Sequence, residues 1–317
     1  MAYPKVVLYH SVVADDSPAD SFAGKHPTRE QLAAHLDYLK SRYRFVSAKE
    51  FVALYEGRSR ASGARPPCLL TFDDGHAGLL ANALPVLEAH RVPCVIFVVA
   101  GTLGEGPAPW YISADYLVRA AEGRTIQYRG RAFDCTSVPG AATLKAAFKR
   151  RYVKLTSGDE REAALEELAH AVGKRPPDLA DLPEDMAFLR PEQVKALSRH
   201  ELIAIGSHGL THKNLSTLSA EEQERELGRS AEILAALTGV ERMMVSYPDS
   251  SHNATTRELA SRYYQFGFAV ELHASRRDRF AYPRTCLGRM SVKGLKYWLS
   301  WRRRYVFSHL RRLLGRG

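Results

Sequence analysis

The stretch LLTFDDGHAG, residues 69–78, places two adjacent carboxylates, Asp73 and Asp74, directly after a run of apolar residues. Neighbouring like charges repel each other, and desolvation at the end of a buried strand increases that cost. Either both aspartates are solvated turn residues, or a positive group lies between them. Residues elsewhere in the chain decide between these two interpretations.

Short apolar segments like residues 69–72 recur along the chain, separated by stretches with a helical pattern. They are rich in Val, Ile and aromatic residues and lack alternation, as expected of strands covered on both faces. This order predicts an α/β fold with a parallel sheet or barrel. The predicted strands are residues 5–9, 68–72, 93–99, 201–205, 243–247 and 267–271.

Three of the intervening helices carry N-terminal signals. Thr28 with Gln31, and Ser219 with Glu222, have the spacing of a capping box. Pro191 suits the first turn of a third helix. These signals predict helices within residues 28–41, 189–200 and 219–237.

The alternation of predicted strands and helices along the chain stops between about residues 103 and 189. This interval has helical segments, the Pro-rich stretch GKRPPDLADLP and no convincing strand. We interpret this interval as a mostly helical insertion within a barrel domain of residues 1–292. Its residues Trp110 and Tyr111 either line a sugar-binding cleft or pack the insertion onto the barrel.

The composition, with 45% hydrophobic and 25% charged residues among 317, is that of a globular protein. No run of 18 apolar residues predicts a membrane span, and the N-terminal sequence does not have the pattern of a secretory leader. We therefore expect a cytoplasmic protein. The four cysteines form no CxxC pair, which predicts reduced thiols rather than a structural zinc site.

A second polar motif follows another predicted strand. In IAIGSHGLTHKNL, residues 203–215, His208 and His212 are spaced to reach one ion, although such a pair is often no more than two surface histidines. Because the carboxyl ends of parallel strands share one face, the histidines and the aspartates would meet there. Two imidazoles and one carboxylate make a hydrolytic zinc site with room for water. One aspartate would then bind the metal ion and the other would accept a proton.

These motifs resemble those of the polysaccharide deacetylases (carbohydrate esterase family 4). The TFDDG motif is present at residues 71–75, and the GSH…H..L motif at residues 206–215. VVLYHSV at residues 6–12 and the segment 35–54 extend the resemblance over most of the chain outside the insertion and tail. The resemblance implies a distorted (β/α) barrel of seven or eight strands that hydrolyses an N-acetyl, sometimes O-acetyl, group of a glycan.

The resemblance also implies roles for individual residues. Asp73 becomes the general base, and Asp74, His208 and His212 become the ligands of a divalent metal ion. The nitrogen-rich ligand set favours Zn²⁺. Such an ion would polarise the amide carbonyl and acidify a bound water.

The third motif departs from the family pattern of Arg-x-Pro-aromatic, because the chain has VSYPDSS at residues 245–251. Pro248 matches, which makes the N–H of Asp249 the candidate donor to the oxyanion. Ser246 stands near the place of the arginine that steadies the base, although a subgroup with AYP here also lacks that arginine. Tyr247 either contacts substrate or packs in the core.

The general acid is the second departure. The family usually supplies a histidine from a late LxH-like motif, and FAVELHASRRDRFAYPR at residues 268–284 offers His273 with only a loose match. His10, directly after the first strand, is the alternative acid and otherwise a candidate substrate contact.

The net charge of +10 is concentrated in residues 293–317, which contain eight Lys or Arg and no acidic residue. Leu295 and Leu299 share a helical face near Trp298 and Trp301, a pattern typical of an amphipathic helix at an anionic membrane. The alternative is a final barrel helix with a solvated basic face. Nucleic acid is not an expected partner, because no recognition motif accompanies the arginines.

The predicted function is a metal-dependent deacetylase that acts on an amino-sugar glycan, or on a glycan intermediate linked to a polyprenyl phosphate lipid. An amidase acting on another N-acyl compound is an alternative from the same chemistry. A non-catalytic carbohydrate-binding relative is an alternative from another class, and it need hold no metal.

Overall fold

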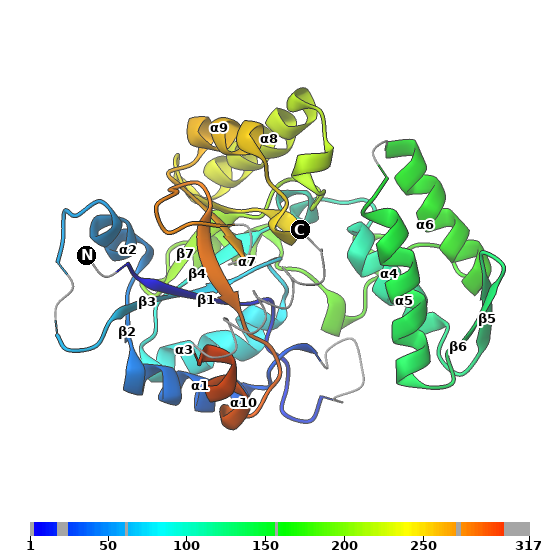
Figure 1. The fold of residues 1–317 in the computed structure, drawn as a ribbon, viewed down its shortest axis with the longest axis horizontal. Coiled ribbons are helices and arrows are strands. Elements are labelled where there is room, and N and C mark those ends of the chain that lie inside the picture. Colours follow the sequence, from blue (N-terminus) through cyan, green and yellow to red (C-terminus); the bar gives the residue numbers. More distant parts are fainter. Residues whose placement is uncertain (1–2, 18–24, 61–62, 156–157, 271–273, 301–317) are drawn as a thin grey trace, which may run out of the picture.

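The computed structural model describes residues 3–17, 25–60, 63–155, 158–270 and 274–300. Within these ranges, seven parallel strands close into a barrel in the order β1, β3, β4, β7, β8, β9, β10 and back to β1, and an eighth, β2, pairs with the start of β3 (Figure 1). This confirms the predicted distorted (β/α) barrel. The strands are β1 (Lys5–Tyr9), β2 (Arg44–Phe45), β3 (Pro67–Phe72), β4 (Cys94–Val98), β7 (Ile203–Ser207), β8 (Met244–Ser246), β9 (Phe266–Val270) and β10 (Tyr282–Cys286).

Both faces of the barrel strands are buried, which explains their continuous apolar sequence. Along β3, Leu70 and Phe72 pack in the cluster shared with the outer helices, whereas Leu69 packs in the cluster inside the barrel. Because side chains alternate along a strand, Thr71 and Asp73 continue the inward row that begins at Leu69. The side chain of Asp73, which directly follows β3, therefore lies in the barrel interior at the carboxyl end of this strand.

Helices cover the outside of the barrel, with α1, α3 and α10 on one side and α8 and α9 on another (Figure 1). The capping boxes at Thr28 and Ser219 are both formed, and α7 begins at Pro191, as predicted. The barrel helices are α1 (Arg29–Arg42), α2 (Ala48–Tyr55), α3 (Leu84–His90), α7 (Pro191–Leu197), α8 (Ala220–Thr238), α9 (Ala254–Tyr263) and α10 (Val292–Leu299).

The interval between β4 and α7 forms a cluster of elements beside the barrel (Figure 1). Its apolar side chains, among them Leu117, Leu144 and Phe148, form a hydrophobic core distinct from those of the barrel. Its elements are α4 (Trp110–Ala120), β5 (Thr125–Tyr128), β6 (Arg131–Asp134), α5 (Val138–Tyr152) and α6 (Gly158–Val172). The expectation of no strand here was wrong, because β5 and β6 pair as an antiparallel hairpin. That residues 103–189 form an insertion separate from the barrel domain stays a prediction.

The first part of the basic tail packs on the barrel. In α10, Leu295 is buried, and the Trp298 indole Nε1 donates a hydrogen bond to the Cys286 carbonyl (2.9 Å). Leu295 is therefore not available to a membrane, which favours the alternative of a final barrel helix, whereas membrane contact through the half-buried Trp298 and the rest of the tail stays a prediction. Trp301 and the arginines of the predicted lipid-binding face, Arg302, Arg303, Arg304, Arg311 and Arg312, lie outside the described residues.

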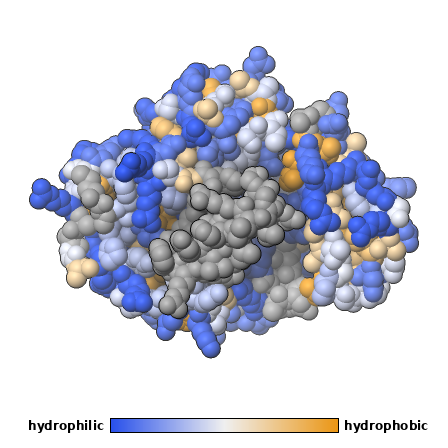
Figure 2. All heavy atoms as spheres, in the orientation of Figure 1, coloured by the Kyte–Doolittle hydropathy of each residue, from blue (hydrophilic) through white to orange (hydrophobic). Residues whose placement is uncertain are grey.

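The described surface offers little apolar area in the orientation of Figure 2, where hydrophilic residues predominate and hydrophobic ones form small scattered groups. Among the described helices, none is long and apolar enough to cross a bilayer. All four cysteines are free thiols, as expected.

Candidate active site

The two aspartates of the opening motif end β3 at the carboxyl end of the barrel. The Asp73 N–H donates to the carbonyl of Tyr9 (2.9 Å), which extends the pairing of β1 with β3 by one residue. Asp74 then adopts a left-handed conformation (φ 72°), followed by Gly75 (φ 77°). This reversal turns the Asp74 carboxylate in a different direction from that of Asp73. A left-handed non-glycine residue is uncommon, and such residues cluster at functional sites.

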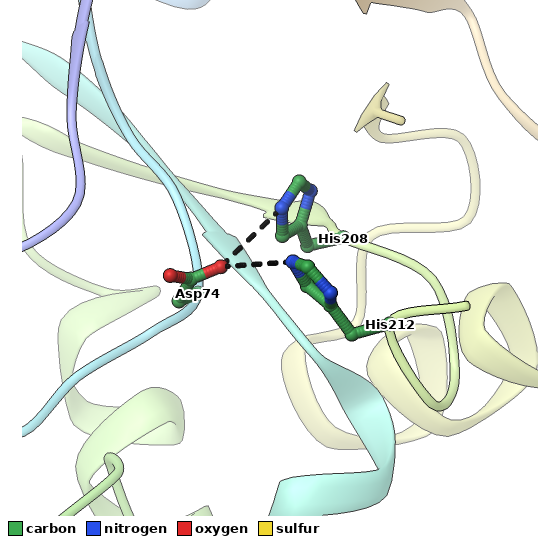
Figure 3. Close-up of side chains that lie close together, drawn as sticks. All are labelled: Asp74, His208 and His212. Carbon is green, nitrogen blue, oxygen red and sulfur yellow. Dashed lines mark ion pairs between the residues drawn. The ribbon is translucent and has the colours of Figure 1, made fainter. Parts of the chain in front are cut away.

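Asp74 meets both histidines of the second motif (Figure 3). Its Oδ1 lies 3.4 Å from His208 Nε2 and 3.4 Å from His212 Nε2. Ligands held at zinc-like bond lengths in a tetrahedron are about 3.3 Å apart, so these separations suit one shared ion. Oδ1 is also buried without a hydrogen-bond partner, which is costly unless a cation is present. The three residues therefore form a group that can hold a metal ion.

His208 is oriented by the neighbouring strand. Its Nδ1 lies 2.7 Å from the carbonyl oxygen of Ser246, at the end of β8. Because a carbonyl only accepts, Nδ1 carries the hydrogen, and Nε2 keeps its lone pair toward Asp74 and His212. A metal-ligating histidine is commonly fixed in this way by its second ring nitrogen.

The loop between the two histidines is held by Glu226 of α8. Its carboxylate accepts hydrogen bonds from the N–H groups of Leu210 (3.1 Å) and Thr211 (2.9 Å) and from the Thr211 hydroxyl. The carboxylate is buried, and His212 at the end of the loop has a left-handed backbone (φ 57°). Glu226 thereby fixes the spacing of the two rings without touching either of them.

We expect Glu226→Gln to weaken metal binding by ~10–100-fold, the usual effect of removing support behind metal ligands. The carboxamide is neutral: its NH2 group can donate to the Thr211 hydroxyl, but the two backbone N–H groups lose their charged acceptor, and hydrogen bonds to a charged group are about twice as strong as neutral ones. Metal affinity is measured by competition with a chromophoric chelator, with the exposed Glu232→Gln on the same helix as the matched control. Unchanged affinity in Glu226→Gln would show that the loop holds its shape by other means.

Asp73 is paired with an arginine that the sequence analysis did not identify. Arg284 of β10 is buried and donates from both terminal nitrogens to the two carboxylate oxygens of Asp73, each at 2.7 Å. Its guanidinium also contacts the hydroxyls of Thr71 and Ser246 and lies near the rings of Phe97 (5.3 Å) and Phe268 (5.8 Å). Arg284 offsets the charge of Asp73, and the two histidines face Asp74. The two adjacent carboxylates can therefore both be buried at the end of β3.

These contacts keep both carboxylates ionised. Burial alone would raise the pKa of Asp73, but the positive charge of Arg284, the hydrogen bonds that Arg284 donates and the neighbouring His208 together outweigh burial, and the pKa lies below its ordinary value. Burial likewise opposes ionisation of Asp74, and contacts with His208 and His212 hold its pKa well below the ordinary value. Asp73 can therefore accept a proton at neutral pH, and Asp74 can ligate a cation.

One pocket of about 390 Å³ at the carboxyl end of the barrel is lined by Asp73, Asp74, His208, His212 and Arg284. Tyr111 of α4 forms part of its wall and packs on the ring of His212, with ring centroids 4.2 Å apart. The Trp110 indole Nε1 donates to the carbonyl of His212 (3.2 Å). Both aromatic residues pack against His212 and its loop and also line the pocket, while the prediction that they contact a sugar stays untested.

The remaining predicted site residues fall into three groups. His10 and Asp249 line the pocket, and Asp249 has a left-handed backbone (φ 49°). Tyr247 is buried in the barrel core and its hydroxyl donates to the carbonyl of Phe280 (2.7 Å), which favours the core interpretation, although its side chain forms part of the pocket wall. His273 lies outside the described residues.

Comparison with known proteins gives the same assignment as the motifs. The family model for polysaccharide deacetylase matches residues 61–139 and 141–267. The chain belongs to the polysaccharide deacetylase family. YxkH of Bacillus subtilis (strain 168), which is named for this family, is 30% identical over 95 residues, which cover 30% of this chain and 34% of YxkH. The chain thus aligns with about a third of the length of this relative.

Several solved structures share the fold of this polysaccharide deacetylase family member. The Streptococcus pyogenes deacetylase PplD matches with a TM-score of 0.59 and 15% identity, over 94% of this chain and 98% of PplD. A de-N-acetylase from Aggregatibacter actinomycetemcomitans matches with a TM-score of 0.56 and 17% identity, over 93% and 99%. IcaB from Ammonifex degensii matches with a TM-score of 0.54 and 19% identity, over 89% and 91%.

Proposed function

We propose that this protein is a metal-dependent hydrolase that removes an N-acetyl group from an amino-sugar glycan or a lipid-linked glycan intermediate. The observation that carries the proposal is the pairing of two differently supported carboxylates in one pocket. Asp74 faces two histidines that can share a metal ion with it, while Asp73 is held by Arg284. This arrangement supports a division of roles between a metal ligand and a base, which together could activate water for hydrolysis of an amide.

The residues of the chain divide the chemistry between them. A bound divalent ion, most simply Zn²⁺, would act as a Lewis acid and activate water. Asp73, ionised and fixed in orientation by Arg284, accepts the proton of the attacking water. Asp249 lines the pocket, and its backbone N–H would donate to the oxygen that becomes negatively charged.

The leaving amine needs a proton. His10 lies on the pocket wall at the end of β1, and burial lowers the pKa of its imidazole. We propose His10 and His273 as alternative general acids. Substitution of the true acid slows an amide far more than an activated acetate ester, because a good leaving group needs little protonation.

Purified protein is expected to bind close to one divalent ion per chain, through Asp74, His208 and His212. His208→Ala removes one of three ligands, so metal should be lost, and acetate release with it. Metal content is measured by mass spectrometry of the intact and chelated protein, with His200→Ala, at the barrel exterior, as the matched histidine control. His208→Ala protein that keeps its metal would refute the ligand assignment.

The function itself is tested by acetate release from free and lipid-linked N-acetylhexosamine glycans. Release that chelation abolishes and added Zn²⁺ restores is the expected result. Metal-loaded protein that releases acetate from none of these glycans would contradict the proposed function.

A further inference from the structure

The hydroxyl of Tyr111 is a polar group at the pocket that neither the motifs nor the proposed chemistry uses. Tyr111 lies in the first turn of α4, and its side chain lines the pocket. The hydroxyl oxygen is closed off from solvent and forms no hydrogen bond with any residue that the structure describes. A buried hydroxyl without a partner costs free energy, so we expect a bound group to supply the partner.

Packing holds the ring of Tyr111 in place. Its centroid lies 4.2 Å from that of the His212 ring and 6.0 Å from that of the Trp110 ring, to which it stands nearly perpendicular. Tyr111 also packs against the small buried cluster that contains Phe188. Rotation of the side chain toward solvent would break these contacts, so the fold fixes where the hydroxyl lies.

The hydroxyl lies among the carboxylates of the pocket. Burial, and after it the negative charge of Asp74, raise the pKa of the Tyr111 hydroxyl well above its ordinary value. Three further carboxylates that line the pocket add to this effect, those of Asp115, Asp249 and Asp73. The hydroxyl therefore keeps its hydrogen at neutral pH, which makes it a donor of a hydrogen bond and a poor source of a transferred proton.

The acetyl group of the proposed substrate supplies a matching acceptor. It must reach Asp73 and Asp74, which are almost fully buried, and so comes to the depth of the Tyr111 hydroxyl. An N-acetyl group has one acceptor, its carbonyl oxygen, and one donor, its N–H. If the hydroxyl accepted the N–H, its own hydrogen would stay unpaired. Donation to the carbonyl oxygen pairs that hydrogen, and the bond strengthens as the oxygen gains negative charge.

We propose that the Tyr111 hydroxyl is a catalytic residue that donates a hydrogen bond to the acetyl carbonyl oxygen and to the negatively charged oxygen formed from it. It would act as a second donor beside the backbone N–H of Asp249. This inference rests on the proposed function. When water attacks, the electron pair of the C=O bond moves onto this oxygen, and it returns when the amine leaves. The phenol keeps its own proton throughout.

The test is Tyr111→Phe in the full metal-loaded chain, with an N-acetylglucosamine oligosaccharide and para-nitrophenyl acetate as substrates. We expect kcat to fall by ~10²–10³-fold, the usual effect of removing one such donor, with KM within a few-fold of the parent. Both substrates should be slowed alike, because both pass through the same charged oxygen. Tyr116→Phe, on the same helix outside the pocket, is the matched control and should keep the parent rates.

The ester separates this role from two others. It carries neither a sugar nor an amine, so a loss confined to the oligosaccharide would assign the hydroxyl to the sugar or to the leaving amine and overturn the inference. Parent-like rates of Tyr111→Phe on both substrates would overturn it as well.

Two measurements do not depend on turnover. Acetate, whose charged oxygens stand in for the reacting one, should bind ~10-fold more weakly to metal-loaded Tyr111→Phe than to the parent, as measured by calorimetry. In urea unfolding without acetate, Tyr111→Phe should be as stable as the parent or more stable, because it removes a buried hydroxyl that has no partner. A clear loss of stability would show that the hydroxyl is bonded within the folded protein, and equal acetate affinity would show that it does not face the reacting oxygen. Either result would refute the inference.

Failure of this inference is distinguishable from failure of the proposed function. Acetate release from glycans that Tyr111→Phe leaves unchanged would refute the role of the hydroxyl and leave the deacetylase proposal intact. A metal-loaded parent that releases acetate from no glycan would contradict that proposal. Weaker acetate binding and slower ester hydrolysis in Tyr111→Phe would still support the hydroxyl as a donor to the acyl oxygen.

Discussion

Asp73→Asn is expected to retain the metal ion and lose ~10²–10⁴-fold in turnover, the usual contribution of a general base. The carboxamide has nearly the shape of the carboxylate but cannot take a proton from water. Because Asp73 is not one of the three convergent ligands, metal content should stay near one per chain. Asp74→Asn is the matched comparison, since it changes the neighbouring carboxylate and should reduce metal binding directly.

The two variants are compared by metal analysis and by steady-state acetate release under saturating metal. Equal metal loss in both would show that the division between base and ligand is wrong. Turnover of Asp73→Asn within a few-fold of the parent would assign the proton transfer to another group, and His10 would be the next residue to change.

The fold was predictable from the sequence where strands are buried on both faces. The apolar runs at residues 5–9 and 68–72 match β1 and β3 closely, because continuous burial leaves a continuous apolar pattern. β10 was not predicted, because its sequence is not a continuous apolar run. It contains Pro283 and the charged Arg284, and both residue types argue against a central strand.

The site was predictable only in part, because a motif identifies a short segment but not the residues from distant parts of the chain that contact it. TFDDG and the histidine pair placed Asp73, Asp74, His208 and His212 at strand ends, and the structure brings all four into one pocket. The counter-ion of Asp73 comes from a residue more than 200 positions away along the chain. The signal available in the sequence was a single arginine within the otherwise apolar run FAYPRTCL, which is the pattern of a buried, paired charge.

Arg284→Met is expected to lower the free energy of unfolding by ~3–5 kcal/mol, because it leaves the Asp73 carboxylate buried without its partner. It should also abolish most activity, since the side chain that orients the base is gone. Arg284→Lys keeps the charge but not the two parallel hydrogen bonds, and should fall between the parent and Arg284→Met. Stability is measured by urea unfolding of the metal-loaded protein at neutral pH.

The pH dependence of this loss follows from the direction of the Asp73 pKa. Folding lowers that pKa below its ordinary value, so the pairing stabilises the protein above the ordinary carboxyl pKa. The contribution is lost as pH falls through the lowered pKa of the folded state. The stability difference between the parent and Arg284→Met should therefore be largest at neutral pH and shrink below about pH 4.

A double-mutant cycle separates the ion pair from the packing of the arginine side chain. Asp73→Asn/Arg284→Met leaves no uncompensated charge in the barrel, so it should be more stable than Arg284→Met alone. Both variants lose the contacts of the guanidinium with Phe97 and Phe268, which makes them a matched pair for packing. Additive losses in the cycle would mean that Arg284 acts on the barrel core and not through Asp73. The expected result is a strong coupling between the effects of the two substitutions on the free energy of unfolding. If Arg284→Lys also binds metal normally but has a low turnover, this arginine acts by holding the base in position.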